Sequence, residues 1–149
     1  MCRSSSSYCI CFALIDRRDY LAHPRNPTGF VSRKIANEAK LLRYVQKHHP
    51  TFHVQGMQID QYDMRIQLKH IVGTDILIGM HGAGLTHAAF LPRHAGLIEL
   101  APNYATSNGE HFMAIARWRR LVYESWQNDD SELEEENEST TVPPQSSVN

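Results

Sequence analysis

A short glycine-rich segment carries the residue types best suited to chemistry. The apolar run 75–80 is typical of a buried strand, and Gly82 and Gly84 follow directly after it. Residues 85–91 then have the composition of a short helix, which Pro92 ends. Glycines let the main chain approach a ligand closely, and a helix N-terminus offers unpaired N–H groups to an anion. The pattern therefore predicts either a diphosphate site or a tight strand-to-helix turn that binds nothing.

The glycine spacing differs from the two standard phosphate-binding fingerprints. Gly79, Gly82 and Gly84 form G-x-x-G-x-G rather than G-x-G-x-x-G, and no lysine follows them as in a Walker loop. A dehydrogenase-like domain is compatible with the fold alone, but the fingerprint that such a site needs is missing.

Three arginines could bring positive charge to the same anion. Arg17 and Arg18 follow the first predicted strand, 8–15, and Arg33 lies at the start of a helix predicted over 32–48. A guanidinium group binds phosphate oxygens through two parallel hydrogen bonds, which suits arginine to this role. The alternative for each arginine is a purely solubilising position on the surface.

Other polar residues have both a functional and a structural interpretation. Asn37 and Glu38 fall in the first turn of that helix, where they could contact a nucleotide or sugar or simply favour the helix N-terminus. Glu99 lies inside an apolar strand and could bind ribose hydroxyls or be the structural partner of a buried arginine or lysine. His81 could donate to a phosphate, support the leaving group or cap the loop, whereas we expect His87 to pack internally.

We expect no metal site and no disulfide framework. The nine histidines include no H-E-x-x-H, the cysteines include no C-x-x-C, and the chain has no D-x-D. A diphosphate site without a metal must balance the diphosphate charge with basic side chains and helix dipoles. Cys2, Cys9 and Cys11 are odd in number, and we expect the latter two to be buried free thiols.

The elements that must position these residues alternate along the chain. Strand-like runs fall at 8–15, 52–59, 75–80, 96–100 and 121–126. Helical patterns fall between them, with Ser32 and Asp60 as candidate N-caps and an S-x-x-E capping box at 107–110. Strands that alternate with helices predict parallel pairing, and hence a Rossmann-like α/β sandwich. We expect a tail at 1–7, this domain at 8–126, and a disordered acidic tail at 127–149.

The net charge of −1 hides an asymmetry. Seven acidic residues and no lysine or arginine lie from residue 127 onward, so the remainder carries 15 basic and 9 acidic residues. A basic body suits an anionic ligand. No basic run with interleaved aromatics argues for nucleic acid, no 18-residue apolar run predicts a membrane span, and we expect no signal peptide.

The string GMHGAGLTH at 79–87, with FLP at 90–92 and IEL at 98–100, resembles glycosyltransferase family 61. The resemblance runs from about residue 9 to 126. It implies the C-terminal half of a GT-B type transferase, which transfers a sugar such as GlcNAc or xylose from a UDP-sugar with inversion. It also implies a protein or glycan acceptor, no metal cofactor, and a place in the lumen of the endoplasmic reticulum or Golgi.

The resemblance also implies a set of donor-binding residues. Related sequences carry an arginine after the first strand, here Arg17 or Arg18, and an R-x-I-x-N-E helix start, here Arg33 with Asn37 and Glu38. The other implied positions are His81, Gly82, Ala83, Gly84, Leu85, Thr86 and Glu99.

The catalytic base of such an enzyme is expected in an N-terminal domain. We therefore expect this chain to be an incomplete enzyme. The alternative is a non-catalytic nucleotide-sugar-binding module, or a pseudo-transferase that acts with a partner.

Overall fold

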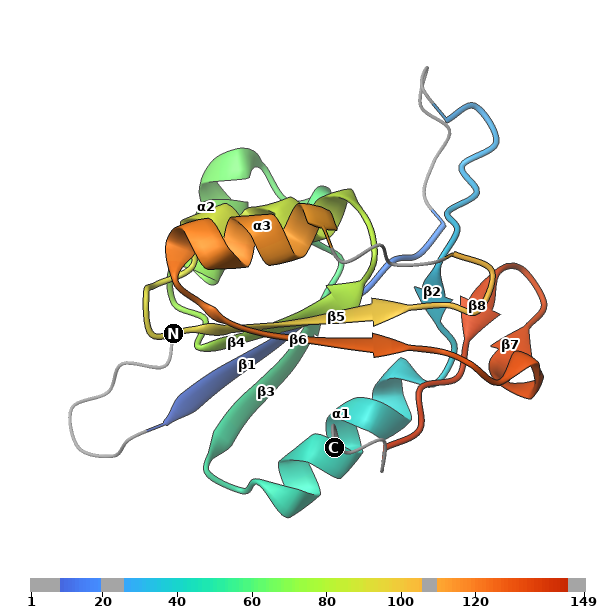
Figure 1. Cartoon of the computed structure of the whole chain (residues 1–149), viewed down its shortest axis with the longest axis horizontal. Coiled ribbons are helices and arrows are strands. Elements are labelled where there is room, and N and C mark those ends of the chain that lie inside the picture. Colours follow the sequence, from blue (N-terminus) through green and yellow to red (C-terminus); the bar gives the residue numbers. More distant parts are fainter. Residues whose placement is uncertain (1–8, 20–25, 106–109, 145–149) are drawn as a thin grey trace.

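A parallel β-sheet forms the centre of the computed structural model, which describes residues 9–19, 26–105 and 110–144. Within these residues the sheet has five strands in the order β3-β1-β4-β5-β6, and each neighbouring pair is parallel (Figure 1). The strands are β1 Ile10–Ile15, β3 Phe52–Met57, β4 Ile76–Met80, β5 Gly96–Ala101 and β6 Val122–Gln127. The predicted α/β class with a parallel, Rossmann-like sheet is thus confirmed.

Helices cover both faces of this sheet (Figure 1). Helix α1, Glu38–His48, lies on one face, and α2, Met64–Ile71, lies on the other with α3, Glu110–Arg119. The 3₁₀ helix η2, Ala83–Phe90, packs against α2 and α3, and a short 3₁₀ turn η1 spans Ile59–Gln61. In the described part of the chain, no helix has the length and apolarity that a membrane crossing requires.

Each face of the sheet has its own hydrophobic core because alternate strand residues point to opposite sides. Ala13, Ile15 and Leu77 belong to the core beneath α2, η2 and α3. Phe12 and Leu14 belong to the core beneath α1. Cys11 is buried and outside any disulfide, as expected, whereas Cys9 is half-buried rather than buried.

Helix α1 begins at Glu38, six residues later than predicted from Ser32. The residues before it are drawn into strand β2, Lys34–Ile35, which pairs with a short strand near the C-terminus. The cap of α2 is Asp63 rather than Asp60, since its carboxylate accepts a hydrogen bond from the Ile66 N–H at 3.0 Å. The predicted capping box at 107–110 lies mostly outside the described residues.

The prediction of a disordered tail from residue 127 is wrong for residues 127–144. Gln127 ends β6, and the following chain forms the 3₁₀ turn η3, Ser131–Leu133, then β7, Glu134–Glu135, and β8, Ser139–Thr140. Strand β8 pairs with β2 on one side and with β7 on the other. We call residues 128–144 the C-terminal strap (red in Figure 1).

The strap is ordered because its few apolar and amide groups find partners far away in the sequence. Val142 is 3 % exposed and packs with Ile35 and Leu41. The Glu134 carboxylate accepts hydrogen bonds from the Asn103 N–H at 2.6 Å and from Thr140 Oγ1 at 2.7 Å. Acidic composition indicates solvation, but it contains no information about such pairing.

We predict that Val142→Ala destabilises the protein by about 2 kcal/mol, because it removes two buried methyl groups and leaves a cavity. Val72→Ala is the matched control, since Val72 is 53 % exposed, and it should change stability by less than about 0.5 kcal/mol. Urea unfolding of both variants measures the difference. Equal and small effects would show that the strap does not contribute to folding.

Candidate functional site

The polar residues predicted for the site follow two adjacent strands. The register pairs Ile15, the last residue of β1, with Gly79 near the end of β4. Because parallel strands end at the same edge, Arg17 reaches the turn after β4, and its Nη1 donates to the His81 carbonyl at 3.4 Å. Open α/β sheets bind their ligands at this edge. The structure thus brings Arg17 and the glycine turn together, as the sequence predicts.

Close packing surrounds both glycines of this turn. A Cβ atom on Gly82 would lie 2.4 Å from Arg17 Nη1, and one on Gly84 would lie 3.1 Å from Ile15 Cγ2. The φ angle of Gly82 is 160°, an extended conformation open to any residue, so a side chain there would displace the end of Arg17 from the turn rather than strain the backbone. The glycines therefore make room for Arg17 and β1 whether or not a ligand is bound.

A buried carboxylate fixes the histidine that opens the turn. Glu99 has no exposed surface, and its oxygens lie 2.5 Å from His81 Nδ1 and 2.5 Å from the Tyr123 hydroxyl. An ionised carboxylate only accepts, so Nδ1 carries the proton and Nε2 is left as the other polar atom of the ring. The His81 ring also meets Phe112 edge-on at 5.3 Å. Glu99 is therefore the partner of a histidine and a tyrosine, whereas the sequence suggested a buried arginine or lysine as its structural partner.

Arg18 and Glu38 pair with each other beside the turn. Arg18 forms ion pairs with Asp16 and, at 2.9 Å, with Glu38. Burial raises the pKa of Glu38, and the Arg18 guanidinium opposes this shift. The two carboxylates raise the pKa of Arg18 in turn. Of the two arginines that the sequence left as alternatives, Arg17 faces the turn and Arg18 faces carboxylates.

Asn37 has a structural partner rather than an open position. Its side-chain amide donates to the Val142 carbonyl at 2.8 Å, and its side-chain oxygen accepts from the Val142 N–H at 2.9 Å. These bonds tie the start of α1 to the strap. The structure thus gives the Asn37 side chain a structural role at the start of α1.

Cavities lie on both sides of the turn. One of about 720 Å³ is bounded by Arg33, His81, Gly82 and Thr86, and by the first turns of α3. Another of about 360 Å³ lies beside Arg17 and is bounded by Gly84, His87 and Gln67 among others. Ala83 lines both cavities. The turn therefore separates two spaces that a ligand could occupy.

Two residues of the motif hold the turn in place. Leu85 is 1 % exposed and belongs to the core, so it supports the turn from below. His87 packs as predicted, since Nδ1 lies 2.9 Å from the Gly84 carbonyl and Nε2 lies 2.8 Å from Gln67 Oε1. Thr86 stays exposed, and its hydroxyl donates to the Ala83 carbonyl at 2.6 Å.

Sequence reasoning missed the contributions of α3 and β6. Glu110, His111 and Phe112 line the larger cavity, and nothing in their spacing indicates this. Tyr123 lies on the same face as Glu99 because the strand register pairs it with Leu97, and this register is known only from the structure.

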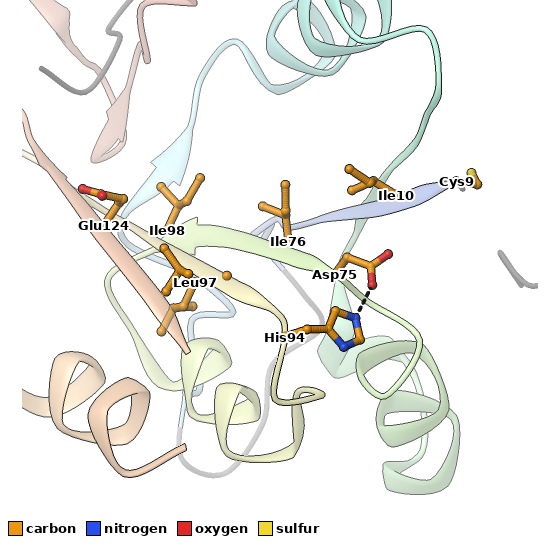
Figure 2. A pocket seen from close by; sticks show the side chains of 10 residues that line it. Cys9, Ile10, Asp75, Ile76, His94, Leu97, Ile98 and Glu124 are labelled. Atoms are coloured by element: carbon orange, nitrogen blue, oxygen red, sulfur yellow. Dashed lines mark hydrogen bonds and ion pairs between the residues drawn. The ribbon is translucent and has the colours of Figure 1, made fainter. Parts of the chain in front are cut away.

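A third cavity lies at the opposite ends of the strands (Figure 2). It measures about 550 Å³ and is bounded by first residues of strands, including Ile10 and Ile76. At its margin His94 Nε2 pairs with the Asp75 carboxylate at 2.7 Å. None of the predicted site residues lines this cavity.

Across residues 9–19, 26–105 and 110–144, no cluster of three or more His, Cys, Asp or Glu could hold a metal ion.

Comparison with known proteins defines the class of protein. Residues 12–98, more than half of the chain, match the family model Glycosyltransferase 61, and the chain belongs to this family. It is 37 % identical over 98 residues to the EGF domain-specific O-linked N-acetylglucosamine transferase of Drosophila melanogaster, across 66 % of this chain and 18 % of that protein. The chain spans about a fifth of the length of the curated relatives it matches.

Two further relatives are named for the transfer of different sugars. The EGF domain-specific O-linked N-acetylglucosamine transferase of Rattus norvegicus is 38 % identical over 97 residues, which cover 64 % of this chain and 18 % of that protein. A beta-1,2-xylosyltransferase of Oryza sativa subsp. japonica is 29 % identical over 113 residues, across 73 % and 21 %. Membership of a glycosyltransferase family is shared by all of them, whereas the transferred sugar differs.

We predict that Glu38 makes the stability of this edge depend on pH. Burial raises its pKa, so the folded state holds the proton more tightly than the unfolded chain does. Stability therefore falls as the pH rises from the ordinary glutamate pKa of about 4.3 through the raised value. The stability of wild type relative to Glu38→Gln should fall between pH 4 and pH 7 in urea unfolding. A relative stability that rises with pH would contradict this, and Glu136→Gln, at an exposed position, is the control.

Proposed function

We propose that this edge of the sheet binds the diphosphate of a UDP-sugar and forms the donor half of a glycosyltransferase site. The observation that carries the proposal is the convergence of Arg17 and Arg33 on one glycine turn, in a chain that belongs to a glycosyltransferase family. Guanidinium groups and helix N-termini are the groups that neutralise a diphosphate without a metal.

The turn offers main-chain donors as well as charged side chains. The first N–H groups of η2 have no partner within the helix, and they follow Gly82 directly. Arg17 lies on one side of the turn and Arg33 on the other. A diphosphate seated on Ala83 would thus meet positive charge from both sides.

His81 is proposed to stabilise the leaving diphosphate. Glu99 holds Nδ1, and the ring borders the larger cavity with 25 % of its side chain exposed. Because Nδ1 is bound to Glu99, Nε2 is the ring atom left to contact a ligand, and in the protonated ring it is a donor. A hydrogen-bond donor directed at the phosphate oxygen that gains negative charge as its bond to the sugar breaks would lower the barrier to transfer.

The remaining parts of the activity are proposed from the family. The chain would be the C-terminal half of a GT-B enzyme that transfers GlcNAc or xylose with inversion to a protein or glycan in the lumen of the endoplasmic reticulum or Golgi. Inversion needs a base that deprotonates the acceptor hydroxyl. We place this base in the other half of the enzyme. The alternative, a non-catalytic nucleotide-sugar-binding module, uses the same donor site.

We predict that the chain binds UDP and that Arg17→Ala weakens binding by about 1.5–3 kcal/mol, roughly 10-fold to 150-fold in Kd. Arg18→Ala is the matched control, because Arg18 is already paired with Asp16 and Glu38, and it should change Kd less than about threefold. Isothermal titration calorimetry with UDP measures both. If Arg18→Ala has the larger effect, the assignment of Arg17 to the diphosphate is wrong. No binding by wild type would refute the donor site itself.

We also predict that UDP binding needs no divalent cation, because arginine and main-chain groups neutralise the diphosphate. Excess EDTA should leave the Kd for UDP within about threefold of its value in Mg²⁺ or Mn²⁺. A tenfold loss of affinity that Mn²⁺ restores would reveal a metal-dependent site.

A further inference from the structure

Arg33 has a backbone conformation that is unfavourable for an arginine. Its φ angle is 60°, in the left-handed region that few residues other than glycine adopt. Arg33 also lines the larger cavity together with His81 and Gly82. A residue in such a conformation stays there only where the surrounding structure holds it.

The surrounding structure comes mainly from the C-terminal strap. Directly after Arg33, the Lys34 N–H donates to the Glu138 carbonyl at 3.2 Å. The Ala36 N–H donates to the Thr140 carbonyl at 2.9 Å, so β8 holds the whole of β2. Figure 1 shows these strands beside each other at the end of the main sheet.

Tyr104 holds the strap at the same point. Its hydroxyl donates to the Glu138 carbonyl at 3.1 Å, and this carbonyl also accepts from the Lys34 N–H. Burial raises the pKa of Tyr104. Tyr104 thus fixes the strap carbonyl that pairs with the main chain directly after Arg33.

The strap is itself anchored at both ends. Near its start, the Asn128 N–H donates to the Ala101 carbonyl at 2.8 Å, and the Glu134 carboxylate accepts from the Asn103 N–H at 2.6 Å. At the other end, Asn37 binds both main-chain groups of Val142. The strap therefore forms a fixed support rather than a flexible extension.

We propose that the C-terminal strap positions Arg33 for the diphosphate, with Tyr104 and Asn37 as its positioning residues. The inference rests on the proposed donor site, and it assigns a role to residues beyond the matched segment 12–98. Neither Tyr104 nor Asn37 touches the ligand. Each acts by holding the backbone on which the Arg33 guanidinium is carried.

The test is a double-mutant cycle on UDP binding by the whole 149-residue chain, measured by calorimetry. Tyr104→Phe should raise the Kd about fivefold when Arg33 is present and less than about 1.5-fold in an Arg33→Ala background. Tyr44→Phe is the matched control, since Tyr44 lies on α1 and stacks on His48. It should leave the Kd unchanged in both backgrounds.

A second pair of variants separates positioning from stability. Asn37→Ala removes two hydrogen bonds to the main chain, and Gln46→Ala removes two bonds to the Pro50 and Phe52 carbonyls. Both should lower the melting temperature, but only Asn37→Ala should weaken UDP binding, and only when Arg33 is present. An equal loss of affinity in both Arg33 backgrounds would overturn the inference.

The outcomes also separate this inference from the proposed function. If the wild-type chain binds UDP and the cycle shows no coupling to Arg33, only the positioning role is overturned. If the wild-type chain binds no UDP, the donor site is refuted and the positioning role with it. If Tyr104→Phe and Asn37→Ala weaken UDP binding only when Arg33 is present, the result supports both the donor site and the positioning role.

Discussion

The Glu99 carboxylate is the constraint on which the site depends. An ionised side chain with no exposed surface costs several kcal/mol unless it is paired and hydrogen-bonded. Its partners come from different segments: Tyr123 from β6 and His81 from the turn after β4. Satisfying one buried charge therefore joins three neighbouring strands at the edge where ligands of α/β sheets bind.

The two neighbouring arginines at this edge have different partners. Arg18 pairs with Asp16 and Glu38, so one guanidinium and two carboxylates join the carboxyl end of β1 to the start of α1. Arg17 donates to a carbonyl of the turn. Which arginine lies against the glycine turn is therefore set by these local contacts and not by the total number of basic residues.

Local patterns predicted the main sheet and the turn, whereas long-range pairing decided the rest. The strands of the sheet have clear apolar runs, and the glycine turn with its motif indicates the family directly. Strands β2 and β8 have two residues each, too few for any periodicity. The contacts that order them join Asn37 to Val142 and Asn103 to Glu134, far apart in the chain. No spacing rule predicts such partners, so composition alone suggested a disordered tail.

The segment that matches the family model therefore differs from the segments that hold the site residues in place. The match ends at residue 98, and so it contains Arg17, Arg33 and the glycine turn. The carboxylate that holds His81 follows it by one residue, and the strap that holds β2 lies between residues 128 and 144. The motif contains the groups that face the proposed donor site, but their directions depend on a buried carboxylate and a strand pairing that other residues provide. Relatives that keep the motif and change the strap would then keep the chemistry and differ in how firmly Arg33 is held.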